Sequence, residues 1–337
     1  MEFAFIGLSA IWCLLAIHYS DPSAGSDRRI RRKTALAACV AIPALSIVFL
    51  PSGTATVISA AILAVTLIWF VRLSPHDRGD WETEYARMPE VEEDGNLIKV
   101  KGVRDFRYRS VEDVIPAYYD DAYDTDSVTS IDLICSYWSG RAIAHVFLSF
   151  GFADGRHVAI SVETRRRRGQ PYSTIAGFFR HYQLIFVVAD ERDLIGVRTD
   201  IRREEVYLYQ LRTTADERRR LFRGYMERAA KLAREPEFYN TVFNNCTSNI
   251  VSLIDGGLPR GERLGMSWRL LFSGYADEFA YDIGRLKSRT TFAELKRRSL
   301  VVRQANAVIG ADFSAAIRSG SPALPSAMSA TPSARSG

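Results

Sequence analysis

Cys246 is the residue of this chain best placed for covalent chemistry. It follows Asn244 and Asn245, two residues that favour the N-cap of a helix, and it precedes an apolar helical stripe that starts at Ile250. A cysteine in the first turn of a helix faces unpaired backbone N–H groups and the positive end of the helix dipole. Both favour the thiolate, which is the nucleophilic form, so the sequence predicts a nucleophile at Cys246.

A cysteine nucleophile needs a base, and His145 is the candidate. It lies far upstream, in an apolar run typical of a strand. A single cysteine and a distant histidine make only a candidate pair. Two other interpretations stay open: Cys246 is a small buried apolar residue, or it forms a disulfide with Cys135 if the domain lies outside the cytoplasm.

The strand that holds His145 belongs to the clearest hairpin in the sequence. Residues 143–150 and 157–163 are both apolar runs, and Ala153–Gly155 separates them as a turn. A three-residue loop with Gly155 in the left-handed conformation suits this turn. A two-residue Asp-Gly loop is the alternative, and it shifts the register by one residue.

The loop length decides which carboxylate can orient His145. In the three-residue register Glu163 lies opposite His145 on the same face, close enough to interact. In the two-residue register Glu163 points to the other face. We therefore predict Glu163 as the third catalytic residue, with His157, at the far end of the hairpin, as the first substitute to check.

Other short strands are expected around this hairpin, together with a helix to cover the sheet. Thr214 and Glu217 have the spacing of a capping box, and an apolar stripe runs through the helix that follows. Further strands are predicted at 97–100, 106–108, 118–123, 131–138, 184–188 and 206–211.

The first 72 residues read as a membrane anchor of two or three helices. Segments 34–50 and 55–71 are uncharged and just long enough to span a bilayer, and 3–17 is marginal. After the anchor we expect a polar linker over 73–95, a catalytic domain over 96–310 and a disordered tail over 311–337 rich in Ser, Pro, Ala and Gly.

The charge next to the first apolar segment argues for one orientation. Five basic residues lie between Arg28 and Lys33, and the positive-inside rule places that loop in the cytoplasm. If 34–71 forms two spans, the domain returns to the same side as this loop. The domain is external only if 34–71 is one span or if the rule is broken.

Composition excludes several other classes of function. The formal net charge of +5 comes mostly from arginine, but the runs 165–168 and 218–220 lack the interleaved aromatic residues of a nucleic-acid site. A solvated face is the expected role of these runs, with anionic lipid head groups as the alternative. The sequence holds no metal-ligand cluster, phosphate-binding loop or Cys-x-x-Cys pair, so no cofactor is expected.

Several runs of residues together resemble a bacterial family, the Lnb N-terminal periplasmic domain. The resemblance extends from about residue 80 to about residue 290. The runs that carry it are Ala144–His145, Ser149–Phe152, Asp154–Arg156, Ser161–Arg165, Tyr182–Ile185, Val188–Asp193 and Asn244–Thr247.

The resemblance implies an α+β fold of the permuted papain-like (NlpC-type) kind. Such a domain has an antiparallel sheet, a histidine on a strand and, later in the chain, a cysteine at a helix N-terminus. It also implies a periplasmic domain on an inner-membrane anchor, in conflict with the positive-inside rule. The founding Lnb proteins are lipoprotein N-acyltransferases that are thought to carry a fatty acyl chain from a phospholipid on a cysteine thioester.

Carried over to this chain, the resemblance makes Cys246 the nucleophile and His145 the base. Asn245 keeps its place before the cysteine, and we expect it to support the substrate or the oxyanion together with Thr247. The expected partners are a phospholipid acyl donor, a lipoprotein amine acceptor and the membrane. Two alternatives remain: a hydrolase of the same fold, acting on cell-wall peptide or lipid ester, and a non-catalytic envelope protein with a structural disulfide.

Overall fold

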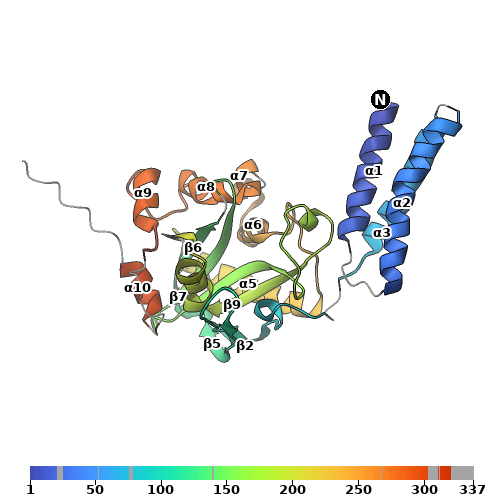
Figure 1. Cartoon of the computed structure of the whole chain (residues 1–337). Coiled ribbons are helices and arrows are strands. Elements are labelled where there is room, and N and C mark those ends of the chain that lie inside the picture. The colour runs from blue at the N-terminus through green and yellow to red at the C-terminus, as the bar shows by residue number, and fades with distance from the viewer. Residues whose placement is uncertain are drawn as a thin grey trace, which may run out of the picture.

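The computed structural model describes residues 1–20, 26–51, 53–75, 79–138, 140–265, 267–302, 310 and 312–319. Three long apolar helices lie beside an α+β domain (Figure 1). The domain has the sheet and the N-terminal helical anchor that the sequence predicts, whereas its permuted papain-like character stays a prediction.

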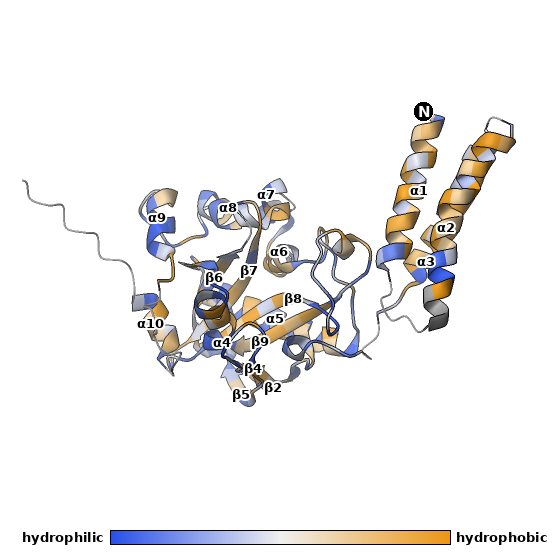
Figure 2. Cartoon of the chain, viewed as in Figure 1, coloured by the Kyte–Doolittle hydropathy of each residue, from blue (hydrophilic) through white to orange (hydrophobic). Residues whose placement is uncertain are grey.

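The three helices are α1 (Glu2–Tyr19), α2 (Ser26–Phe49) and α3 (Thr54–Arg72). Within the described residues these three are long and apolar enough to cross a membrane, and their apolar character is visible along their length (Figure 2). The Glu2 carboxylate accepts hydrogen bonds from the Gly53 N–H (3.0 Å) and the Thr56 hydroxyl (2.7 Å). The marginal first segment is thus a full helix packed on the other two.

The strands of the domain form an antiparallel-rich sheet. In the described residues its order is β1-β2-β9-β8-β7-β6-β10, with β5 paired to β2. Only the β2–β9 contact is parallel among these pairs. The bounds are β1 (Glu90–Asp94), β2 (Leu97–Arg104), β5 (Tyr118–Asp124), β6 (Val128–Tyr137), β7 (Ala144–Phe152), β8 (His157–Arg165), β9 (Gln183–Asp190) and β10 (Glu205–Gln210), with a separate pair β3 (Arg107–Tyr108) and β4 (Val114–Ile115).

The hairpin of β7 and β8 has the predicted three-residue loop. Phe150 pairs with Val158 and Leu148 with Ile160, the register that sets residue 145 against residue 163. Gly155 has a φ of 86°, a conformation that glycine adopts without steric cost. The register prediction is therefore confirmed.

Two layers of helices cover the sheet. On one face, α5 (Ala215–Arg234) and α6 (Cys246–Gly256) pack over the apolar residues of β7, β8 and β9. The capping box of Thr214 and Glu217 starts α5 as predicted. On the other face lie α4 (Glu191–Gly196), a π-helical turn (Val197–Ile201) and α10 (Phe313–Ser319). The remaining helices are α7 (Trp268–Leu271), α8 (Ala276–Asp282) and α9 (Phe292–Ser299).

The structure differs from the predicted domain plan at both ends. Strand β1 lies inside the segment 73–95 that was predicted as a linker. Its acidic residues face lysines of β2, as in the Lys101–Glu92 pair at 3.3 Å, so their charge is compensated across an edge pair.

At the other end, α10 lies inside the predicted disordered tail. Phe313 and Ile317 are buried against α4, and Arg318 binds two buried carboxylates, so a seven-residue helix gains enough contacts to order. Residues 320–337 lie outside the described part of the chain.

Candidate active site

Cys246 is the first residue of α6, as the sequence predicts. Asn245 is the N-cap: its side-chain oxygen accepts a hydrogen bond from the Ser248 N–H (2.8 Å), and the Ser248 hydroxyl accepts one from the Asn245 N–H (2.8 Å). This reciprocal pair fixes the backbone on both sides of Cys246.

Asparagines also fix the loop before the cysteine. The Asn244 amide donates to the Phe238 carbonyl (3.0 Å), and the Asn249 amide donates to the Asn244 side-chain oxygen (3.0 Å). Asn249 is buried, so this network holds α6 to its preceding loop from the inside. The thiol therefore starts from a rigid backbone.

The Cys246 side chain meets His145 where β7 and β8 separate. The described pairing of these strands ends at Leu148 and Ile160, so the next part of β7 is free of β8. The thiol hydrogen-bonds to the His145 side chain and accepts a hydrogen bond from the backbone N–H of Val146. The Val146 N–H, which would bond to β8 if the pairing of the hairpin continued, thus points toward the sulfur.

His145 is held on its other side by a buried carboxylate. Its Nε2 lies 3.0 Å from Glu163 Oε1 and 2.6 Å from the Ser161 hydroxyl, which itself donates to Glu163 at 2.8 Å. Arg198 Nη2 donates to the same carboxylate oxygen at 2.8 Å. Because Nε2 faces the carboxylate, Nδ1 is the nitrogen left for the thiol proton.

These contacts shift the protonation of all three groups. Burial alone would lower the pKa of His145, but the Glu163 charge and the hydrogen bonds of the ring to Cys246 and Glu163 raise it to about 9. Burial would raise the pKa of the Cys246 thiol, yet its hydrogen bond and charge interaction with His145 lower it. The pKa of Glu163 is held well below its usual range, against burial, chiefly by His145 and then by Arg198. The arrangement favours a thiolate–imidazolium pair.

The sequence analysis did not identify Ser161 and Arg198. Ser161 lies two residues before Glu163, and the alternation of a strand places both on one face. Arg198 is only 5% exposed and follows an apolar run, Leu194–Val197, in the π-helical turn. An arginine in so apolar a segment is a signal of a buried ion pair, but nothing in the sequence gives its partner.

Asn245 and Thr247 lie at the site, with their side chains engaged in packing. The Asn245 amide donates to the Thr241 carbonyl (2.6 Å), and the Thr247 hydroxyl lies 3.0 Å from both Asn245 Oδ1 and the Leu270 carbonyl. The backbone N–H groups of Cys246 and Thr247 meet no acceptor in the described part of the chain. The side chains of Asn245 and Thr247 therefore position the backbone, and oxyanion support by either residue stays a prediction.

Cys246, His145, Glu163 and Arg198 all line one cavity of about 530 Å³. Its mouth is rich in large apolar side chains that are exposed to solvent. Six of those exposed on the domain line the cavity: Trp138, Ile143, Tyr172, Phe178, Leu271 and Phe272. Three more exposed apolar residues, Ile175, Phe243 and Trp268, lie close in sequence to residues that line the cavity. An apolar patch of this kind marks an interaction surface.

The same loop that lines this mouth also binds the helical anchor. Phe178 faces the cavity, while the carbonyl of Phe179 accepts a hydrogen bond from the Ser20 hydroxyl at 2.9 Å. Arg180 donates to the carbonyls of Phe70 and Leu73, both at 2.8 Å. The loop therefore connects the cavity to the ends of α1 and α3.

Two other residues considered in the sequence lie apart from this chemistry. His157 is at the turn end of the hairpin, where its Nδ1 lies 3.1 Å from the Gly155 carbonyl. Cys135 is fully buried on β6, and its thiol is free, as is that of Cys246.

The fold and the site thus define an α+β domain with a cysteine, a histidine and a carboxylate assembled at a helix N-terminus. Residues 115–274, which hold this site, match the model of the Lnb N-terminal periplasmic domain, the family that the sequence resembles. The match is shorter at both ends than the resemblance drawn from the sequence. No curated protein and no solved structure matches the chain. The family and the apolar helices are consistent with a membrane-anchored protein that has a periplasmic domain.

Proposed function

We propose that this protein is a membrane-bound cysteine acyltransferase that takes a fatty acyl group from a phospholipid. The observation that carries the proposal is the hydrogen-bonded series from Cys246 through His145 to Glu163 in a cavity with an apolar mouth. The thiolate is the nucleophile, His145 transfers the proton and Glu163 holds the imidazolium.

The proposed reaction has two balanced steps. The Cys246 thiolate attacks the ester carbonyl, the carbon–oxygen bond breaks, and the lysophospholipid alcohol leaves with the proton of His145. An amine then attacks the thioester and passes a proton to the now neutral His145, the carbon–sulfur bond breaks, and the thiolate–imidazolium pair is regenerated as the amide forms. Backbone N–H groups of Cys246 and Thr247 face the developing oxyanion in both steps.

A lipid substrate is favoured by the surroundings of the cavity. Exposed Trp138, Tyr172 and Phe272 form part of its mouth, and tryptophan and tyrosine prefer the interface of a bilayer. The connection of the loop around Phe179 to the anchor supports a mouth close to the membrane surface. Water in place of the amine would make the same site a lipid esterase.

Intact-mass analysis of the full chain in phospholipid nanodiscs tests the proposal. We expect an added acyl mass that neutral hydroxylamine removes, as it does a thioester. The Cys246→Ser variant should carry no hydroxylamine-sensitive adduct, while Cys135→Ser, the matched control, should keep it. Absence of an adduct on the unmodified chain, together with turnover of a soluble peptide, would favour the peptidase alternative.

The apolar mouth gives a second readout. Replacement of Trp268 and Phe272 by serine should reduce adduct formation from bilayer lipid at least tenfold. The same double variant should react normally with a short-chain soluble thioester, because the catalytic groups are unchanged. Equal loss with both donors would mean that these side chains support the fold and not lipid access.

A further inference from the structure

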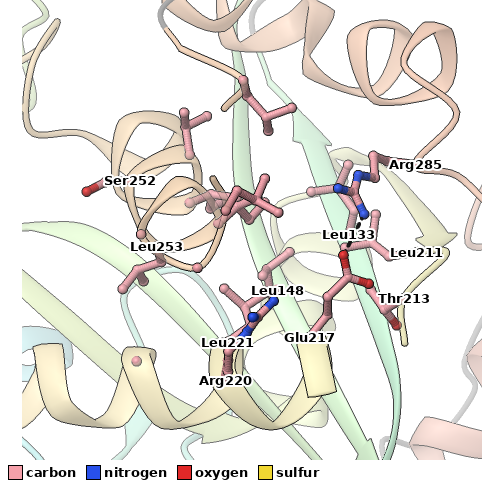
Figure 3. Close-up of a pocket in the computed structure, with 18 of the residues that line it drawn as sticks. Leu133, Leu148, Leu211, Thr213, Glu217, Arg220, Leu221, Ser252, Leu253 and Arg285 are labelled. Carbon is pink, nitrogen blue, oxygen red and sulfur yellow. Dashed lines mark hydrogen bonds and ion pairs between the residues drawn. The ribbon is translucent and has the colours of Figure 1, made fainter. Parts of the chain in front are cut away.

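A second cavity, of about 800 Å³, lies behind α6, on the side away from Cys246. Strands β6 and β7 form its floor, and α5, α6 and α8 form its walls (Figure 3). Its volume is in the range of small-molecule sites in proteins. It is therefore large enough for a ligand and distinct from the catalytic cavity.

The interior of this second cavity is aliphatic. Figure 3 shows leucines from α5, α6 and the strands pointing toward one space. The side chains that line it include Leu133, Leu148, Leu221, Ile250, Leu253 and Ile283. Such a surface offers dispersion contacts but few hydrogen-bond groups, so it suits a hydrocarbon chain better than a sugar or a nucleotide.

The charged residues that line the cavity are five arginines and four carboxylates (Asp126, Asp216, Glu217 and Glu227), an excess of one positive charge. Several of its basic residues are paired: Arg285 with Glu217 (2.8 Å), Arg219 with Asp126 (2.6 Å) and Arg223 with Glu93 (2.7 Å). Arg212 and Arg220 form no ion pair within the described residues. Figure 3 shows the Arg220 side chain extending from α5 toward Leu148 and Leu221. A ligand with an anionic group at one end of its hydrocarbon chain would complement both features.

The two cavities share part of their wall. Thr247 lines both, and Val146 lines the second cavity with its side chain while its N–H binds the Cys246 sulfur. A ligand behind α6 would therefore press on two residues that position the nucleophile.

We propose that this second cavity binds one long hydrocarbon chain with an anionic head group, such as a fatty acid or a lysophospholipid. The head group lies at Arg220 and Arg212, and the chain lies between α5 and α6. The proposal does not depend on acyl transfer, since Cys246 takes no part in it.

Photo-crosslinking of the full-length Cys246→Ser variant in phosphatidylcholine nanodiscs tests the site. A palmitic acid with a diazirine in its chain should label peptides that contain residues 221–224 and 250–254. Excess palmitate should displace it, and hexadecanol, which lacks the anion, should compete at least tenfold less well. Competition by lysophosphatidic acid would show that a phosphate head group is accepted; its failure would restrict the site to carboxylates.

Two variants separate specific binding from general lipid contact. Ala280→Trp fills the cavity and should remove the labelling of α5 and α6. Arg220→Glu reverses the charge at the rim and should weaken the labelling at least tenfold, whereas Arg260→Glu, in an exposed 3-10 turn, should not. Labelling confined to α1–α3, or α5 and α6 labelling that both variants leave unchanged, would overturn the proposal.

Discussion

His145 contacts Glu163 on one side and hydrogen-bonds to Cys246 on the other, so it connects the carboxylate to the thiol. Nε2 faces Glu163 and Ser161, so the ring is held by a carboxylate that is itself held by Arg198. Nδ1 is left for Cys246. A proton taken from the thiol therefore stays on a ring whose charge is already compensated.

This geometry predicts how activity depends on pH. His145 must be protonated to give its proton to the leaving alcohol, and its pKa is raised to about 9, so acyl transfer should fall as pH rises through about 9. Glu163→Gln removes the charge that raises this pKa, and the falling limb should move to lower pH. Rates of adduct formation between pH 5 and pH 10 provide the measurement.

Glu262→Gln, at an exposed position, is the matched control and should leave the limb in place. A falling limb that is unchanged in Glu163→Gln would show that His145 does not set it.

At the scale of single residues, sequence reasoning pointed to Cys246, His145 and Glu163, and the structure places these three side chains together. It did so because each lies on an element with a clear local signal: an N-cap before Cys246, and one hairpin for His145 and Glu163. Arg198 comes from the opposite layer of the domain. Which helix packs over which strand depends on the whole core, and a local pattern does not contain that information.

At the scale of elements, the hairpin and the first turn of α6 decide whether the site forms. The three-residue loop sets the register, and a shift by one would move Glu163 to the other face. The cap on α6 sets the direction of the thiol.

The cap gives a prediction for the helix. Asn245→Ala removes the acceptor for the Ser248 N–H and should cost about 1 kcal/mol of folding stability. Asn245→Ser keeps an acceptor and should lose less. A thermal melt of both variants, with the rate of Cys246 alkylation by iodoacetamide, provides the measurement. A full loss of stability in the serine variant would assign the effect to the hydrogen bond with Thr241 instead.

Helix α10 gives a second prediction at this scale. Arg318 binds Glu191 (2.7 Å) and Asp132 (2.6 Å), whose side chains are 0% and 3% exposed. Arg318→Met leaves both carboxylates buried without a cation, which should cost on the order of 3 kcal/mol. For a domain of this size that corresponds to a melting temperature about 6–12 °C lower.

The matched control for this helix is Arg260→Met, at an exposed position without such partners, which should change the melting temperature little. Equal stability of the Arg318 variant would mean that α10 is a loosely attached element.

The same helix shows where sequence reasoning failed among the elements. Residues 313–319 are short and lie beside a low-complexity segment, so composition indicates disorder. The helix is ordered by Phe313 and Arg318 contacting α4 and β6, which are distant in the chain. Strands with alternating or continuous apolar runs were predicted well, because their periodicity is local.

At the scale of the whole molecule, the three apolar helices decide on which side of the membrane the domain lies, and that side limits which acceptor it can meet. Three spans place the N-terminus opposite the domain, and they place the basic segment 28–33 on the domain's side. The family is one of periplasmic domains, whereas the positive-inside rule favours the cytoplasm.

We follow the family and expect the domain outside the cytoplasm. A reporter that is active only outside the cytoplasm should then be active when it is fused to the C-terminus. A second fusion after Phe49, between α2 and α3, should be inactive and serves as the control. Activity of the second fusion alone would place the domain in the cytoplasm and would remove a lipoprotein acceptor from the proposal.

The position of the basic segment has a consequence for biogenesis. With the domain outside, a net four positive charges of residues 27–33 must cross the bilayer against a potential that is negative inside. Each charge requires about 2.3 kcal/mol per 100 mV, so the electrical work is roughly 9 kcal/mol per 100 mV. Insertion of this chain should then proceed more readily when an ionophore dissipates the membrane potential, the reverse of what is expected for a segment with exported acidic residues.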